Sequence, residues 1–353
     1  MDFTLTEEQT ELRQLAADLV ERITPDRVEQ AETTAENFDR ALWADLAQAG
    51  LLGISLPEDV GGHGLGLVEF ALVAEQLGRV VAPVPYVWTT AAALAIATYG
   101  NDEQRHRWLQ GVVSGDIVLT CALPQGTADV RVDGDRLSGT VLGVPYAHVA
   151  AAVLVPVDGR VYAVVPDQVT PAHATSREVF GMVTLDGAAA EVVGDEQTAD
   201  WLWQRIALGL VGLQAGVTDA ALRMASDYTS QRKQFEKPLS SFQGVSHRLA
   251  DGYVDNAAIR SSMLQAAWHL DEGHDAIEHV LSAAWWAAEG GQACVHITQH
   301  LHGGMGADVT YPIHRYFLWG KQIEMLLGGA SALLARLGDE LLTRPQAGDA
   351  VTV

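Results

Sequence analysis

The chain has 353 residues, 48% of them hydrophobic, which is enough to bury a large core and to fold as more than one domain. Its formal net charge of -23 and pI of about 4.7 disfavour a general electrostatic affinity for nucleic acid or anionic membranes. Cys121 and Cys294 lie far apart in apolar contexts, so they indicate neither a disulfide framework nor a thiolate metal site nor a nucleophile.

The start of the chain, MDFTLTEEQTELRQL, is acidic and amphipathic, unlike a signal peptide. No apolar run reaches the roughly 18–20 residues that cross a bilayer. From these two observations we expect a soluble cytoplasmic protein with no membrane span.

Residues 1–114 have a helical pattern and predict an N-terminal α-helical domain. Thr6 precedes apolar residues that recur every three or four positions as far as Ile23, so we expect Thr6 to cap the first helix. Further helices are predicted over residues 38–49 and 67–80, with a Gly- and Pro-rich loop between them.

The pattern changes at about residue 115. Short β-branched runs separated by turn signals predict a small antiparallel β domain over 115–195. Residues 196–345 are helical again, and the continuous apolar stripe between Leu202 and Ala221 is typical of a bundle helix. The last residues, 346–353, predict a flexible tail. The order helix, strand, helix gives a mainly α fold with a middle β domain and argues against a Rossmann layout.

One stretch, YTSQRKQFEKPLSSFQ at 228–243, gathers cations and aromatic rings around Pro238 in a chain with few cations. The Arg232 guanidinium is a planar fork of donors suited to a phosphate, and Phe235 offers a face to a flat heterocycle. The pair is therefore suited to a nucleotide. The alternative is that Arg232 caps the carbonyls of the preceding helix while Phe235 plugs the end of a bundle.

A second stretch, QHLHGGMG, contains Gly303 and Gly304, whose backbone amides can approach a phosphate closely. No strand precedes it, so it is neither a phosphate loop nor a dinucleotide fingerprint. His296, His300 and His302 have no acidic helix partner in a His-Glu-x-x-His arrangement. We therefore expect no metal site.

Three segments together resemble the acyl-CoA dehydrogenase family over nearly the whole chain. They are GLLGISLPEDVGGHGLGLVEFALVAEQLGR, YTSQRKQFEKPLSSFQGVSHRLAD and QHLHGGMG followed by YPIHRYF. The resemblance implies an FAD-dependent dehydrogenase with an N-terminal α-helical domain, a small antiparallel β domain and a C-terminal four-helix bundle.

In this family the last two segments hold the ADP half of an FAD whose ring lies in the neighbouring subunit. The resemblance thus implies that Arg232 binds the pyrophosphate, Phe235 packs on the adenosine and Gln243 adds a hydrogen bond. Gly303 and Gly304 would let the backbone approach the cofactor.

The chain departs from the family at the catalytic base. The family reaction needs a carboxylate that removes the α-proton of an acyl thioester while the β-hydride passes to the flavin. In the loop that carries this Glu in many members, the chain reads EMLLGGAS, with Leu327 at the Glu position. Glu324, one turn earlier, is either a structural helix residue or a displaced base. The second familiar location, early in the long helix, has no acid between Arg205 and Thr218.

The flavin-ring contacts also differ. The family's ring-binding loop corresponds to ALPQGTAD at 122–129, and the Trp-Ile-Thr segment that usually follows has become VPYAHVA. His300 stands where the family has Gln in the ADP half-site, and Glu236 stands where it has Gly. The resemblance therefore retains most of the ADP half-site but not the base or the ring-side contacts.

This asymmetry leads to the hypothesis of a heterodimer or α2β2 heterotetramer with a paralogous acyl-CoA dehydrogenase subunit that supplies the base. The implied substrate is an acyl-CoA thioester, by analogy a bulky steroid-side-chain thioester. Electron-transfer flavoprotein is the implied electron acceptor. The alternatives are a homomeric dehydrogenase that uses Glu324 and a flavin-free structural paralogue.

Overall fold

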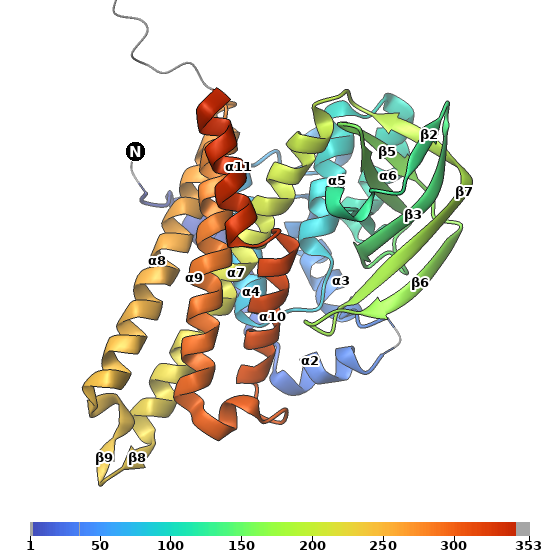
Figure 1. Cartoon of the computed structure of the whole chain (residues 1–353). Helices are drawn as coiled ribbons and strands as arrows, with labels where there is room; N and C mark the ends of the chain where they lie inside the picture. The colour runs from blue at the N-terminus through green and yellow to red at the C-terminus, as the bar shows by residue number, and fades with distance from the viewer. Residues whose placement is uncertain (1–2, 35, 344–353) are drawn as a thin grey trace, which may run out of the picture.

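A computed structural model of the chain describes residues 3–34 and 36–343 (Figure 1). The predicted tail at 346–353 lies outside the described residues. The α-helices are α1 (Glu7–Val20), α2 (Pro25–Glu32), α3 (Arg40–Gln48), α4 (Leu67–Arg79), α5 (Tyr86–Tyr99), α6 (Asp102–Ser114), α7 (Thr198–Gln231), α8 (Gln243–Asp271), α9 (Ile277–His302), α10 (Ile313–Leu326) and α11 (Ala330–Thr343). The strands are β1 (Leu119–Cys121), β2 (Arg131–Asp133), β3 (Arg136–Pro145), β4 (Ala152–Val157), β5 (Arg160–Val164), β6 (Gln168–His173), β7 (Val179–Val193), β8 (Lys233–Gln234) and β9 (Lys237–Pro238).

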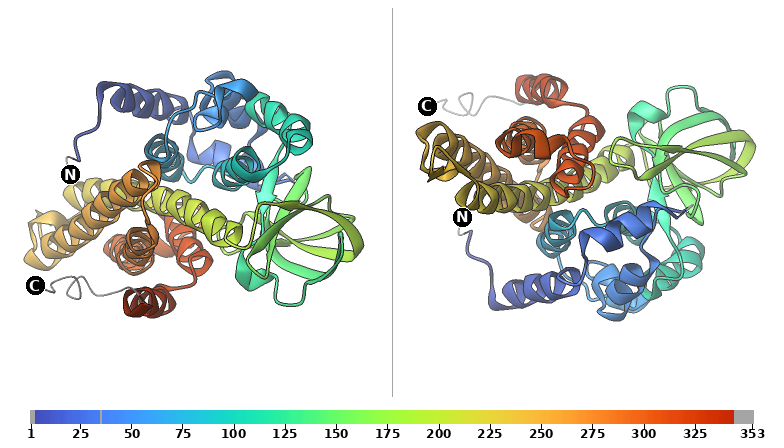
Figure 2. Two further views of the ribbon diagram at one scale, coloured as in Figure 1. Left: turned by 90° about the horizontal axis from the view of Figure 1, so that it is seen from above. Right: turned by 90° about the horizontal axis from the view of Figure 1, so that it is seen from below.

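The predicted fold class is confirmed, because helices precede and follow a seven-stranded sheet. Viewed from above and below, the sheet lies at one end of the molecule, while the N-terminal and C-terminal helices form two groups beside it (Figure 2). Helices α7, α8, α9 and α10 pack together as the predicted bundle, and α11 adds a further helix against α9. We propose the limits 1–114, 115–195 and 196–345 for the three parts of the chain.

The sheet has the strand order β1-β4-β5-β7-β3-β2, with β6 also paired to β7. The predicted antiparallel arrangement holds for every pair except β1 and β4, which run parallel with Leu119 opposite Ala152. A parallel pair needs a crossover connection rather than a tight turn, and here the β2–β3 hairpin lies in that connection.

Two helix starts show how the N-terminal helices are fixed. Thr6 caps α1 as predicted: its hydroxyl accepts from the Gln9 amide at 3.2 Å, and the Gln9 side chain accepts from the Thr6 amide at 3.1 Å. Helix α4 is capped by a residue about 200 positions later in the sequence. The Asp271 carboxylate accepts from the amides of Leu67 at 2.6 Å and Val68 at 3.1 Å. Asp271 thereby ties the end of α8 to the start of α4.

Helix α7 is the central element, and it is buried more fully than an apolar stripe predicts. A Cβ atom on Gly216 would lie 1.9 Å from the Glu75 carbonyl oxygen, so this glycine permits α4 to lie directly against α7. Helix α7 is also long and apolar enough to cross a membrane, but 78% of that apolar window is buried within the fold. It is the core helix of this structure.

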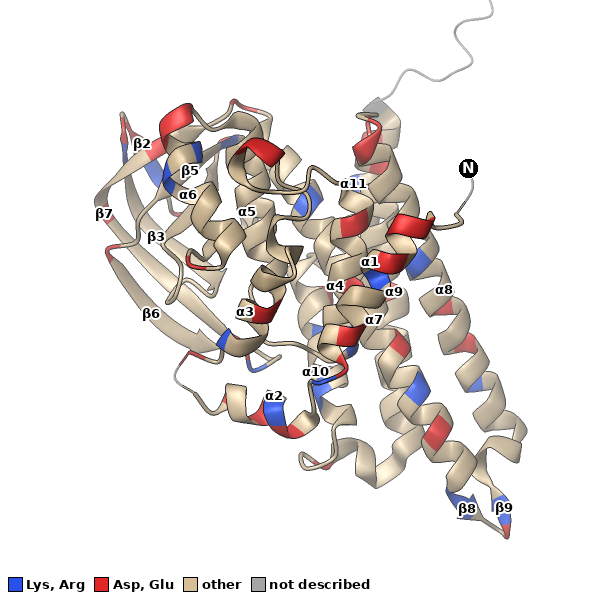
Figure 3. Ribbon diagram, turned by 180° about the vertical axis from the view of Figure 1, so that it is seen from behind, with Lys and Arg blue, Asp and Glu red and all other residues tan. Residues whose placement is uncertain are grey.

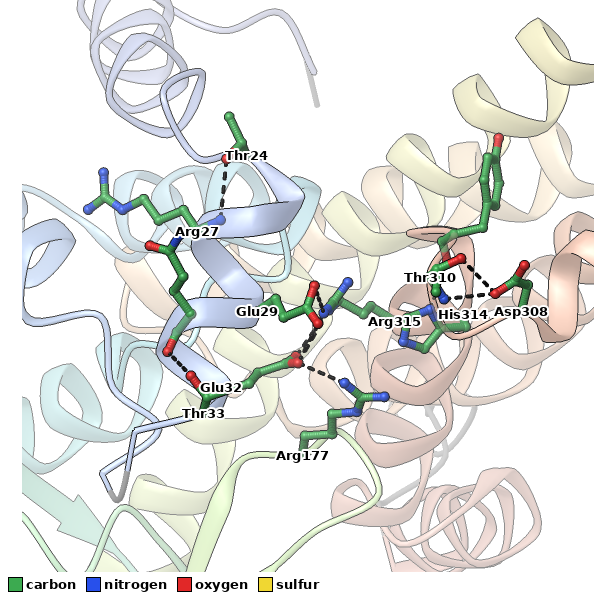
Figure 4. Close-up of polar contacts among 12 residues, drawn as sticks. Thr24, Arg27, Glu29, Glu32, Thr33, Arg177, Asp308, Thr310, His314 and Arg315 are labelled. Carbon is green, nitrogen blue, oxygen red and sulfur yellow. Dashed lines mark hydrogen bonds and ion pairs between the residues drawn. The ribbon is translucent and has the colours of Figure 1, made fainter.

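All three parts of the chain meet at one buried ion cluster (Figure 4). The Glu32 carboxylate, at the end of α2, accepts from Arg315 of α10 at 3.2 Å and from Arg177 of the β6–β7 loop at 2.9 Å. The side chains of Glu32 and Arg315 are only 7% and 5% exposed. Glu29 lies 3.8 Å from Arg315 and adds a second, mostly exposed carboxylate.

We expect Glu32→Ala to lower the free energy of unfolding by about 3 kcal/mol, because it leaves a buried guanidinium without its main counter-ion. Denaturant unfolding followed by circular dichroism measures this loss. Glu36→Ala is the matched control: its ion pair with Arg40 is exposed, so a loss under about 0.5 kcal/mol is expected. Equal losses for the two variants would contradict the role given to Glu32.

Candidate functional site

The β8–β9 hairpin lies at the end of the bundle remote from the sheet (Figure 1), with Arg232 directly before β8 and Phe235 between the two strands. Arg232 follows the last residue of α7 in an extended conformation, and its side chain is exposed. The β8–β9 hairpin then places Phe235 at its tip, where the residue is 87% exposed. The alternative was that Arg232 caps helix carbonyls and that Phe235 fills the end of the bundle. Among the described residues the Arg232 guanidinium makes no hydrogen bond to a helix carbonyl, and Phe235 is too exposed to fill the bundle end.

The glycine segment lies at this same end of the bundle. The Tyr228 ring, one turn before Arg232, stacks on His302 with ring centroids 4.7 Å apart, which joins the ends of α7 and α9. Gly303 follows with φ 59° and ψ −133°, a conformation that suits glycine. A Cβ atom on either Gly303 or Gly304 would meet no atom within 4 Å, so both face open space. The backbone here is accessible to a ligand.

Gln243 and His300 are also exposed at this end. Gln243 is the first residue of α8, and its side chain lies 3.4 Å from the His247 ring. His300 lines an open cavity of about 350 Å³ between α8 and α9 together with Arg248 and His296. Sequence reasoning did not single out Arg248, which adds a second guanidinium on the helix that Gln243 begins.

The residue that the resemblance places at the position of the family's base, Leu327, is a core residue. Leu327 follows α10, is 4% exposed and belongs to the main hydrophobic core. Gly328 and Gly329 then adopt φ values of 94° and 83°. Glu324 lies one turn before Leu327 and is paired with Lys321 of the same helix.

Early α7 offers no room for a carboxylate either. From Arg205 to Thr218 every residue except Leu213 is buried. A Cβ atom on Gly209 would lie 2.5 Å from Val87 and 2.7 Å from Phe70, so the helices around α7 already fill this space. Burial lowers the pKa of the Arg205 guanidinium to about 10, and this group lies 3.8 Å over the Trp201 ring.

The loop that corresponds to the family's ring-binding segment lies beside Leu327. Gln125 in this loop donates to the carbonyl of Leu326 at 3.4 Å. Residues 122–129 therefore lie next to the end of α10, although the two segments are about 200 residues apart in sequence. The structure brings together the two segments in which the chain departs most from the family.

A buried polar cluster in the β domain was missed by sequence reasoning. Tyr146, in the segment VPYAHVA, donates to the Glu178 carboxyl at 3.2 Å, and Ser176 donates to the same group at 2.8 Å. Burial raises the pKa of Glu178, and these two hydrogen bonds oppose the rise. Nothing in the local sequence signals this contact, because Tyr146 and Glu178 come from different loops.

Other reaction types that the sequence analysis discounted find no support among residues 3–34 and 36–343. No group of three His, Cys, Asp or Glu side chains is arranged to hold a metal ion there. Burial raises the pKa of both the Cys121 and Cys294 thiols. Neither thiol is therefore an activated nucleophile.

The residues at the hairpin end fit one half of a dinucleotide. An exposed guanidinium, an exposed ring and an accessible glycine backbone suit a pyrophosphate and a base. They form an open surface at the end of the bundle. Around Leu327, by contrast, packed apolar side chains leave no ionisable group at the base position.

Family models for the acyl-CoA dehydrogenase N-terminal and C-terminal domains match residues 6–116 and 200–341. Among curated proteins, the acyl-CoA dehydrogenase FadE27 of Mycobacterium tuberculosis is 38% identical, covering 98% of this chain and 100% of its own length. The acyl-CoA dehydrogenase FadE28 of the same organism is 36% identical over 84% of this chain and 91% of its own length.

Two solved structures are similar over almost the whole chain. A chain of the ChsE4-ChsE5 complex from Mycobacterium tuberculosis has a TM-score of 0.93 and 38% identity, covering 98% of this chain and 100% of its own. A chain of a variant of the Tcur3481-Tcur3483 steroid ACAD has a TM-score of 0.91 and 44% identity, covering 96% and 99%.

The hairpin generates a prediction of its own. Phe235 and Glu236 adopt φ values of 51° and 65°, which cost a residue with a side chain roughly 1–2 kcal/mol. Glu236→Gly removes this strain at one position and should stabilise the hairpin. The Leu239 amide donates to the Arg232 carbonyl at 2.8 Å. We therefore expect slower hydrogen exchange of the Leu239 amide. Gln234→Gly, in the extended part of the hairpin, should have the opposite effect. Faster exchange in Glu236→Gly would contradict the strain assigned to this turn.

Proposed function

Because this chain belongs to the acyl-CoA dehydrogenase family, whose members are FAD-dependent, we propose that it is the subunit of a heteromeric acyl-CoA dehydrogenase that supplies the ADP half of a shared FAD site. A paralogous subunit supplies the flavin-ring contacts and the catalytic base. The assembly is a heterodimer or an α2β2 heterotetramer.

The observation that carries this proposal is the contrast between the exposed hairpin end of the bundle and the buried base position. At the hairpin end, Arg232, Phe235 and the Gly303–Gly304 backbone are exposed and free to meet a ligand held by another chain. At the base position, by contrast, lies Leu327, a residue of the hydrophobic core whose side chain has no ionisable group. A homodimer of this chain would have two ADP half-sites and no base at that position.

The residues of this chain have positioning roles in the proposed reaction. Arg232 neutralises the pyrophosphate with charge-assisted hydrogen bonds, Phe235 packs on the adenosine, and Gln243 and His300 add polar contacts. Bound FAD supplies the chemistry by accepting a hydride from the β-carbon of the acyl chain. Fixing the ADP half stabilises one placement of the ring in the partner's site, where the partner's carboxylate removes the α-proton.

The substrate we propose is a CoA thioester with a bulky, steroid-like side chain, and the support is similarity to a structure described as a steroid ACAD. The support for a paralogous partner is similarity to a chain of the ChsE4-ChsE5 complex. Electron-transfer flavoprotein is the proposed electron acceptor, and the cytoplasm is the proposed location.

The flavin content of the complex tests the shared site. The chain is purified alone and after co-expression with a paralogue that carries the family glutamate, and FAD is measured by absorbance. We expect no FAD on the chain alone and about one FAD per heterodimer. Arg232→Ala should lower the FAD content at least about tenfold, because it removes a charge-assisted contact to the pyrophosphate.

Arg136→Ala is the matched control, since it removes an exposed arginine from the β domain and should leave the FAD content unchanged. Unchanged FAD in Arg232→Ala would favour the flavin-free structural role. A full complement of FAD on the chain alone would favour a homomeric enzyme.

Glu324 separates the proposal from the homomeric enzyme with a displaced base. Its pairing with Lys321 supports a structural role. We expect Glu324→Gln to leave turnover of the complex within about twofold, whereas loss of a general base lowers turnover about 10²–10⁴-fold. A loss in that range would identify Glu324 as the base.

A further inference from the structure

A cavity of about 460 Å³ lies between α1, α4, α7 and α8. Figure 3 labels these four helices, and the β8–β9 hairpin lies away from α1 and α4. Four arginines and two acids line it. The arginines, which form the arginine basin, are Arg13, Arg79, Arg223 and Arg260. The acids are Glu75 and Asp219. Each of the four helices contributes at least one of these charged residues.

The acids do not balance the arginines. Arg79 and Arg223 share one oxygen of Asp219, at 3.2 Å and 3.0 Å from their Nε atoms. Arg260 Nε lies 2.9 Å from Glu75 Oε1, whereas Arg13 forms no ion pair with any residue that the structure describes. Four cations and two carboxylates leave an excess of two positive charges in a chain whose net charge is -23.

The cavity also has features of a built site. Glu75 is 6% exposed, and its Oε2 atom has no hydrogen-bond partner among the described residues. Burial raises the pKa of Glu75 in spite of the neighbouring arginines. Tyr253, which is 70% exposed, lines the cavity as an aromatic ring open to solvent. Guanidinium groups held around a concave surface by the buried Glu75 and the partly buried Asp219 are pre-organised for an anion.

We propose that the arginine basin binds a small anion that carries a phosphate or diphosphate group. The planar guanidinium fork matches phosphate oxygens, and the two excess charges match a dianion. The volume lies in the range of small-molecule sites. Asp18 and Glu21 line an adjoining cavity with Arg79 and Arg223 and limit the positive region on that side.

Isothermal titration calorimetry with pyrophosphate tests this site. The full-length chain is used in the assembly in which it purifies. All measurements use an Arg232→Ala background, which removes the ADP half-site. We expect saturable 1:1 binding that Arg13→Gln and Arg223→Gln each weaken about tenfold, as expected for the loss of one charge-assisted contact. Glu75→Gln should tighten binding, because it removes a negative charge. Thermal unfolding of each variant checks that the fold is retained.

Arg160→Gln is the matched control, an ion-paired arginine in the β domain that should leave pyrophosphate affinity unchanged. Pyrophosphate binding that persists in the Arg232→Ala background but is insensitive to both Arg13→Gln and Arg223→Gln overturns the proposal. No binding at millimolar pyrophosphate overturns it as well. The proposed FAD role is tested separately, because flavin content responds to Arg232 and not to Arg13.

The affinity for ADP, compared with that for pyrophosphate, shows whether the site takes a nucleotide or a free phosphate. Tighter binding of ADP, lost in Tyr253→Ala, assigns a nucleotide whose base packs on the Tyr253 ring. Equal affinities assign a free phosphate or diphosphate. Either result supports the phosphate site.

Discussion

The buried contact between Glu32 and Arg315 fixes the relative placement of everything that bears on function. Glu32 ends a helix of the N-terminal part, Arg315 begins α10, and Arg177 joins them from the β domain. Leu327 directly follows the same helix α10, and Gln125 of the ring-side loop donates a hydrogen bond to the carbonyl of Leu326 in its last turn. If the sheet shifted against α10, the ring-side loop and the base position would separate. One ion cluster thus links the N-terminal helices, the β domain and the helix that leads to Leu327.

Much of this architecture could be predicted from local sequence. Thr6 was predicted to cap the first helix, and it caps α1. The helix predicted over residues 67–80 is α4, Leu67–Arg79. The apolar stripe between Leu202 and Ala221 lies within α7, Thr198–Gln231. The segment at 228–243 could be assigned because motif and spacing survive in the chain. The same reasoning placed Leu327 where the family has Glu.

Other features depend on contacts that no local pattern encodes. Glu32 and Arg315 are 283 residues apart, and a Glu in a helix end is most often solvated. The contact between Tyr146 and Glu178 joins two loops whose pairing depends on the sheet. The burial of α7 between Arg205 and Thr218 was underestimated, because a stripe of apolar residues predicts one buried face. Its glycines permit a second close neighbour on the other side.

The Asp271 carboxylate determines when helix α4 can complete its folding. It caps a helix that begins 204 residues earlier, at Leu67. During synthesis, α4 emerges from the ribosome long before its cap exists, so its first turn has unpaired amides until the end of α8 has been made. The N-terminal part therefore cannot reach its final form as an independent co-translational unit. Completion of α4 is a late event, and a chain interrupted before residue 271 would leave the start of this helix frayed.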